Sequence, residues 1–369
     1  MIEKIKAHYF FIFLWCIQSS VIGSNRTVAT IGVGDTPAGI AITPDNRFAY
    51  VANNNNDGIS GGDTVSVIDL LTNTVKQTIS DASFNQPYTI TINKNGTKAY
   101  VTNSNSTTVT IIDIASNTVI GVIDGFDGPS GFAITPDGNT AYVNNYGGPD
   151  GVGSGNGITV RVVNLNTDSI VGPAITVQQA PASLAITPNG AFVYVINYID
   201  GNPGTGTISV IQTSNNTVVG TIYGGFSGPF AIAITPDGKY AYVTNFGSNN
   251  FSPVGTTVSV VNIATNTVEK VINLGIQPSG IAITPDGRFV YVSNYNTLYL
   301  GAGFTDLTAF IGTINIIDVR TNEVLSPVLV TGASPDAIAI SPNGQRAYVT
   351  NYSSNNVSVI NIIDTMWLS

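Results

Sequence analysis

A motif pair recurs seven times along the 369 residues and constrains the fold more than any other feature of the sequence. Each unit opens with a proline, continues through an alternating apolar stretch, and then reaches a tight turn such as Thr-Pro-Asp-Gly. The opening prolines are Pro37, Pro87, Pro129, Pro181, Pro229, Pro278 and Pro335. A strand ending in Tyr-Val-x-Asn follows each turn, and its tyrosines are Tyr50, Tyr100, Tyr142, Tyr194, Tyr242, Tyr291 and Tyr348. Such self-similarity indicates a repeat architecture.

Each unit has room for four short strands. After a loop of variable length, a third strand appears, as in residues 64–70, and a short turn then leads to a fourth strand, as in residues 268–273. These turns are centred on Asn73, Asn117, Asp168, Asn216, Asn266 and Asn322. Because the alternation has period two and no helical period occurs in the repeats, each unit is predicted to be a propeller blade.

The last unit ends early, after its third strand at residues 357–363. Residues 27–31 match a fourth strand and precede the first repeat at the usual distance. We therefore expect an all-β, seven-bladed β-propeller of four-stranded antiparallel blades, in which the N-terminal strand completes the last blade. Closing the ring in this way removes exposed sheet edges.

The seven Tyr-Val-x-Asn and Thr-Pro-Asp-Gly elements resemble the YVTN β-propeller repeat family. The resemblance covers nearly everything after Ser24. It implies a secreted, periplasmic or surface-displayed protein, similar to the YncE group or to archaeal surface-layer propellers. Since these motifs form the scaffold itself, they indicate the fold far more than the function.

The N-terminus is predicted to be a cleaved signal peptide over residues 1–23, followed by one propeller over residues 24–369. Lys4 and Lys6 precede an apolar run at residues 9–17, and Gly23 is a small residue at the cleavage position. A buried strand and an uncleaved anchor are the alternatives, but the run is short for a spanning helix. We therefore expect a secreted or surface-associated protein, periplasmic in a Gram-negative source.

Composition argues against several partners and reactions. Only 9% of residues are charged and the formal charge is −9, so neither a nucleic acid nor a membrane surface is expected to bind. The single Cys and the single His, Cys16 and His8, lie in the predicted signal. A mature chain without thiol or imidazole lacks the usual nucleophiles, bases and zinc or haem ligands. We predict no cofactor, no catalytic residues and no enzyme activity.

Carboxylates do not change that prediction. The two glutamates of the mature chain, Glu269 and Glu323, fall on the outer strand or its turn, away from the axis. The candidate calcium ligands on the loop side are Asp35, Asp57, Asp63, Asp150 and Asp336. Because isolated Asp residues in loops commonly cap turns, no metal site is predicted.

The loops after the second strands and between blades share one face and vary in length, so function is expected there. The residue after the repeated Asn is aromatic in five blades and is predicted to form a partial ring around the channel mouth. These residues are Tyr146, Tyr198, Phe246, Tyr295 and Tyr352. Tyr299 and Phe304 lie alongside, in the longest loop. Exposed rings would form a platform for a ligand, whereas packing between blades is the alternative.

The leading hypothesis is a non-catalytic binding or scaffold protein that engages a protein or glycan through the loop-rich face. A structural surface-layer or particle-coat component is the second hypothesis, and a lactonase-type hydrolase using Asp residues is the third. Elution volume at several concentrations separates the first two, and metal analysis bears on the third. Seven Asn-x-Ser/Thr sequons make a glycoprotein possible in a eukaryotic source: Asn25, Asn95, Asn105, Asn215, Asn250, Asn351 and Asn356.

Overall fold

The computed structural model describes residues 26–55, 63–147, 157–199, 205–247, 254–295 and 311–362. The predicted signal peptide, the loop residues Tyr299 and Phe304, and the carboxylates Asp57 and Asp150 lie outside these ranges. Within the described residues, no helix is long and apolar enough to cross a membrane.

The described residues form 28 strands that occupy four positions in each blade. The innermost strands are β2 (Pro37–Ile42), β6 (Pro87–Ile92), β10 (Pro129–Ile134), β14 (Pro181–Ile186), β18 (Pro229–Ile234), β22 (Pro278–Ile283) and β26 (Pro335–Ile340). The second strands are β3 (Phe48–Asn53), β7 (Lys98–Asn103), β11 (Thr140–Asn145), β15 (Phe192–Asn197), β19 (Tyr240–Gly247), β23 (Phe289–Asn294) and β27 (Arg346–Asn351).

The two outer positions complete each sheet. The third strands are β4 (Thr64–Asp69), β8 (Thr108–Asp113), β12 (Thr159–Asn164), β16 (Thr207–Gln212), β20 (Val254–Asn262), β24 (Ile311–Asp318) and β28 (Asn356–Asn361). The outermost strands are β5 (Thr74–Ser80), β9 (Thr118–Asp124), β13 (Ser169–Thr176), β17 (Thr217–Ile222), β21 (Thr267–Asn273), β25 (Glu323–Ala333) and β1 (Arg26–Gly32). A short 3-10 helix, η3 (Tyr352–Ser354), follows β27.

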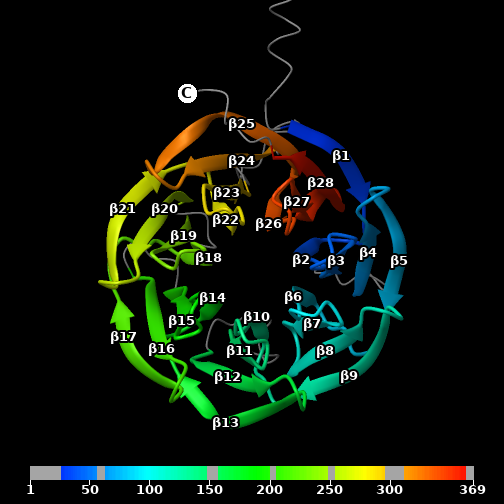
Figure 1. The fold of residues 1–369 in the computed structure, drawn as a ribbon, viewed down its shortest axis with the longest axis horizontal. Helices are drawn as coiled ribbons and strands as arrows, with labels where there is room; N and C mark the ends of the chain where they lie inside the picture. Colours follow the sequence, from blue (N-terminus) through cyan, green and yellow to red (C-terminus); the bar gives the residue numbers. More distant parts are fainter. Residues whose placement is uncertain are drawn as a thin grey trace, which may run out of the picture.

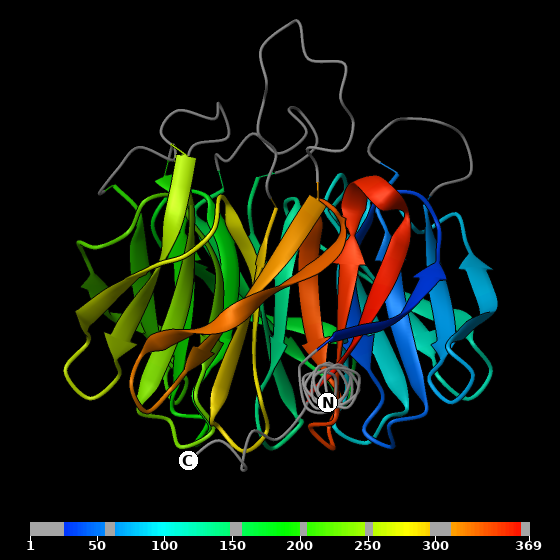
Figure 2. The same ribbon diagram turned by 90° about the horizontal axis from the view of Figure 1, so that it is seen from above.

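Seven four-stranded antiparallel sheets surround a common axis, and the innermost strands face that axis (Figure 1). The predicted seven-bladed propeller is confirmed. The tight turns that join first to second strands and third to outermost strands gather at one end of the ring, at the bottom of Figure 2. The connections that vary in length therefore share the opposite end.

The ring closes as predicted, because β1 is the outermost strand of the sheet that holds β26, β27 and β28 (Figure 1). The β1–β28 ladder runs from Arg26 opposite Asn361 to Gly32 opposite Asn356. Two bonds of the Asn355 side chain beyond the ladder strengthen this closure. Asn355 Oδ1 accepts from the Thr36 N–H at 2.9 Å, and the Asn355 side chain donates to Asp35 at 2.8 Å.

The hydrophobic core lies between neighbouring blades. In one of its seven clusters, for example, Tyr100 and Ile111 of the second blade pack against Phe132 and Val143 of the third. The blades approach so closely that the inner strands need small residues on one side: a Cβ on Gly39 would stand 2.3 Å from the Tyr88 carbonyl oxygen.

The repeated tyrosines join each blade to the next. All seven are at most 1% exposed. Five of their hydroxyls donate to the Asn or Asp at the centre of the outer turn in the following blade, a residue held at positive φ. The pairs are Tyr50–Asn117, Tyr100–Asp168, Tyr142–Asn216, Tyr194–Asn266 and Tyr242–Asn322. The seventh blade has no such turn, because its outermost strand is β1. Tyr291 therefore has no equivalent partner among the described residues.

Candidate functional site

The five aromatic residues after the repeated Asn occupy the same structural level. In each case the backbone N–H donates to the carbonyl of the residue that precedes the inner-strand proline of the same blade. These bonds are Tyr146 to Gly128 (3.0 Å), Tyr198 to Ala180 (2.9 Å), Phe246 to Gly228 (2.9 Å), Tyr295 to Gln277 (2.9 Å) and Tyr352 to Ser334 (2.9 Å). The accepting residues all have positive φ. The same backbone geometry therefore places all five aromatic residues at the loop-rich end of the ring.

Three of the five rings meet one another. The Phe246 and Tyr295 ring centroids are 6.0 Å apart, and those of Tyr295 and Tyr352 are 6.2 Å apart. Phe230, from the inner strand β18, extends the row with a centroid 5.3 Å from that of Phe246. All four side chains are half-buried, so part of each ring faces solvent. The fifth, sixth and seventh blades therefore share one continuous aromatic surface near the axis.

Tyr88 belongs to the same group, although it comes from the second blade. Burial raises its pKa well above the ordinary value, and the neighbouring Asp336, Tyr146, Tyr295 and Tyr352 raise it further. Tyr88 is the second residue of the innermost strand β6, as Phe230 is of β18, so it stands at the same level next to the axis. We use the name axial cluster for Tyr88, Tyr146, Phe230, Phe246, Tyr295 and Tyr352.

Tyr198 is placed differently from the other four. Its side chain is 5% exposed, and its hydroxyl donates to the Gly247 carbonyl at 2.6 Å, in the next blade. This geometry differs from the exposed platform expected from the sequence and matches the alternative of packing between blades. The backbone of the fourth blade places Tyr198 at the same level as the other four aromatic residues. The Gly247 carbonyl lies within reach there, so the Tyr198 hydroxyl bonds to it and the ring packs between the blades. Any role of the seven predicted residues in ligand binding stays a prediction.

Replacing Tyr198 with Ala is therefore expected to lower the free energy of unfolding by roughly 3 kcal/mol, because a buried ring is lost and a buried carbonyl loses its donor. Chemical denaturation measures the change. Tyr223→Ala is the matched control, since Tyr223 is 70% exposed and should change stability by less than about 0.5 kcal/mol. Equal effects of the two substitutions would contradict the packing role.

Asp336 brings a carboxyl group into the axial cluster. It follows the proline of the inner strand β26, at the position held by Tyr88 and Phe230 in their blades. Ser279 donates to its Oδ1 at 2.7 Å, and Ser293 donates to its backbone carbonyl at 2.7 Å. Burial of the carboxylate raises the pKa of Asp336 to about 6, although the Ser279 hydrogen bond lowers it.

The raised pKa predicts how stability depends on pH. Asp336 binds a proton more tightly in the folded state, so its favourable contribution is complete below the ordinary pKa of 3.8 and is lost as pH rises through about 6. Asp336→Asn has no ionisable carboxyl group, so its free energy of unfolding should not fall over this pH range for this reason. The variant should match the parent near pH 4 and exceed its unfolding free energy near pH 8 by up to about 3 kcal/mol. Denaturant titrations across this range test the effect, and a constant difference at every pH would contradict it.

From the sequence, Asp336 was predicted to be one of the loop aspartates, and neither Tyr88 nor Phe230 was predicted to belong to the site. A signal was present. The residue after the opening proline is Ala or Ser in four blades, namely Ala38, Ser130, Ala182 and Ser279, and is large or charged in the other three. These three exceptions mark the axial cluster.

The other carboxylates lie apart. Asp35 accepts from the Asn355 side chain, and Asp63 accepts from the Gln86 N–H, so both are engaged in bonds between loop segments. Glu269 and Glu323 are in the outermost strands β21 and β25, as expected. Among the described residues, no group of three or more His, Cys, Asp or Glu side chains is arranged to hold a metal ion.

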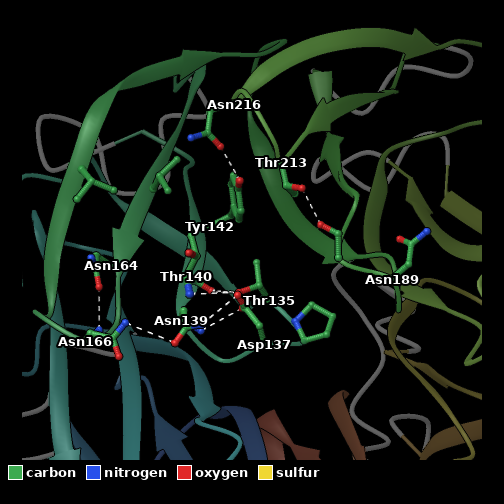
Figure 3. A pocket seen from close by; sticks show the side chains of 14 residues that line it. Thr135, Asp137, Asn139, Thr140, Tyr142, Asn164, Asn166, Asn189, Thr213 and Asn216 are labelled. Atoms are coloured by element: carbon green, nitrogen blue, oxygen red, sulfur yellow. Dashed lines mark hydrogen bonds between the residues drawn. The ribbon is translucent and has the colours of Figure 1, made fainter.

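Pockets of similar size recur on the tight-turn face, between neighbouring blades. Their volumes are about 460, 430, 470 and 400 Å³. Figure 3 shows the pocket between the third and fourth blades, where the Tyr142 hydroxyl donates to Asn216 at 2.5 Å and Thr213 donates to the Gly190 carbonyl at 2.7 Å. Since equivalent clefts form at four of the junctions between repeats, we regard them as products of the repeat geometry.

A family model described as "Lactonase, 7-bladed beta-propeller" matches residues 22–120, 196–300 and 227–366. The chain belongs to this family. The match agrees with the closed ring of seven blades, and it covers the blades that carry Tyr88, Tyr295 and Asp336. The family description does not by itself assign a reaction to these residues.

Two curated relatives of this lactonase-family chain come from Mycobacterium tuberculosis (strain ATCC 25618 / H37Rv). The chain is 32% identical to the seven-bladed beta-propeller protein Rv1057 over 153 residues, which are 41% of this chain and 35% of that protein. It is 49% identical to the PE-PGRS family protein PE_PGRS18 over 59 residues, 16% of this chain and 13% of that protein. The matches thus span about a third of one relative and an eighth of the other.

A solved structure of similar shape is Kuenenia stuttgartiensis hydrazine synthase. It superimposes with a TM-score of 0.73 at 24% identity, covering 89% of this chain and 96% of that chain. At this identity the likeness shows the fold alone.

Proposed function

We propose that the protein is a non-catalytic binding protein whose partner, a protein or a glycan, docks at the loop-rich end over the axial cluster. The observation that carries this proposal is the continuous row of half-buried rings from Phe230 to Tyr352. Rings held by a rigid scaffold offer contact area at low entropic cost. The opposite end is built of near-identical turns whose polar groups largely bond to one another.

We also propose where the protein is located. The motif pattern supports a place within the lactonase family beside the YVTN-repeat propellers, which implies secretion or surface display. The basic and apolar segment at residues 1–23 supports the same setting as a signal peptide.

Binding of the purified chain to protein and glycan arrays tests the proposal. For a ligand found there, Tyr295→Ala should weaken affinity by about 30-fold, the change typical of an aromatic anchor worth 2 kcal/mol. Tyr223→Ala, an exposed tyrosine outside the cluster, is the control and should leave affinity unchanged. A ligand that tolerates Tyr295→Ala, or arrays without any ligand, would count against the axial cluster as the binding site.

A lactonase-type hydrolase is the second candidate, favoured by the family model and by Asp336. A carboxyl group with a pKa near 6 suits general acid or base catalysis at physiological pH. Hydrolysis of a panel of simple lactones by the parent chain and by Asp336→Asn tests this candidate. Turnover that the substitution abolishes would establish the hydrolase and displace the non-catalytic proposal.

A further inference from the structure

We propose that the axial cluster and Asp336 together bind an alkylammonium group, a positively charged nitrogen carried by a small ligand or by a lysine side chain of a partner protein. This inference rests on the proposed function and names the chemistry that the site recognises. It follows from the charge at the axis, the geometry of the carboxylate and the rings that surround it.

Asp336 is the one charged side chain on the seven inner strands. No Lys or Arg occurs in β2, β6, β10, β14, β18, β22 or β26. The two ion pairs among the described residues, Lys98–Asp168 and Lys239–Asp237, lie elsewhere. Asp336 is half-buried, and an ionised carboxylate that is partly removed from water costs free energy unless a cation accompanies it. The axis therefore favours a positive ligand and disfavours an anion.

The carboxylate is held in place with one oxygen available. The Ser279 hydroxyl lies 2.7 Å from Oδ1 and 3.0 Å from the backbone carbonyl oxygen of Asp336, so its single hydrogen is shared between them, and Ser293 donates to the same carbonyl. Among the described residues, no donor reaches Oδ2. Serines of the sixth blade thus orient the group, while the second oxygen is left for a ligand donor.

Aromatic rings complete the recognition of a cation. The backbone N–H of Tyr352 donates to the carbonyl of Ser334, two residues before Asp336, and the Tyr352 ring centroid is 6.2 Å from that of Tyr295. Burial raises the pKa of Tyr88 and Tyr295, and the charge of Asp336 raises the pKa of both further. Tyr352 and Phe246 flank Tyr295 in the row of rings. Ring faces attract ammonium groups, most strongly where water is excluded. A carboxylate beside several rings binds an alkylammonium group better than a neutral sugar of the same size.

Calorimetry with choline tests the inference on the full chain. The matched probe is the neutral carbon analogue of choline, in which a tert-butyl group replaces the trimethylammonium. We expect choline to bind at least tenfold more tightly than the analogue, and Asp336→Asn to remove that preference. Asp127→Asn is the control variant, because it removes an exposed carboxylate near the inner strand β10 and should keep the preference.

A second variant distinguishes the contribution of the aromatic ring to binding from that of the carboxylate charge. Tyr295→Leu retains apolar area and removes the ring face, so choline should bind more weakly while the analogue is unaffected. Comparing choline with Nα-acetyl-lysine methylamide shows which source the site prefers, a free quaternary amine or a lysine side chain.

Equal measurable affinities of choline and its analogue, failure of both choline and Nα-acetyl-lysine methylamide to bind, or an unchanged preference in Asp336→Asn would overturn the inference. The proposed function is judged separately. An array ligand that depends on Tyr295 but tolerates Asp336→Asn would retain the binding site and reject its cation specificity.

Discussion

Deleting residues 24–34 is expected to lower the melting temperature strongly and to make the protein associate. The deletion removes β1, so β28 loses its ladder partner from Asn356 to Asn361. It also removes Ile31, which is 5% exposed and packs with Tyr348, Val357 and Val359. The cost should far exceed the roughly 1 kcal/mol of a typical point substitution, and the exposed edge invites pairing between molecules. Thermal melts and light scattering measure both effects.

A circular permutant provides the control. Arg26 lies opposite Asn361, so β1 can be attached after Ile362 through a short Asn-Gly-containing turn, with the new chain starting at Asp35. This chain keeps every strand and should recover most of the melting temperature. A deletion variant that melts like the parent would mean that β1 contributes little to the last blade.

Replacing Gly39 with Ala is also expected to lower the free energy of unfolding strongly. The added Cβ would stand 2.3 Å from the Tyr88 carbonyl oxygen, and a backbone atom between two packed sheets cannot move aside cheaply. Forcing the first and second blades apart should cost about 3 kcal/mol. Chemical denaturation monitored by circular dichroism measures this loss.

Gly220→Ala is the matched control, because Gly220 lies in the outermost strand β17 with no atom within 4 Å of an added Cβ. It should be neutral or slightly stabilising. If Gly39→Ala behaved in the same way, the blades would tolerate a wider spacing than their packing indicates.

The repeat predicted the architecture because each residue of the motif makes the same kind of contact in almost every blade. Gly39 allows close approach, Tyr50 links two blades, and Asn117 supplies the turn with positive φ that accepts the tyrosine hydroxyl. Position in the repeat also predicted that the residue after the Asn stands at the same level in each blade, as the shared bonds of Tyr146 and Tyr352 show.

The repeat did not predict the direction in which these aromatic side chains point. Tyr198 and Tyr295 hold equivalent backbone positions, yet one hydroxyl bonds to Gly247 in the next blade while the other ring joins the axial cluster. The difference depends on which atoms the neighbouring blade presents, and these atoms come from residues about 50 positions away, such as Gly247 for Tyr198.

The sequence by itself determined the blade count, the strand order and the closure by residues 27–31, which the structure extends by one residue at each end, because these follow from local periodicity and turn chemistry repeated seven times. Only the tertiary structure brought Tyr88, Tyr295 and Asp336 together. They come from the second, sixth and seventh blades, and nothing in their local sequence links them. Closing the ring places them around one axis, and burial there shifts the pKa of a carboxyl group that looked like an ordinary loop aspartate.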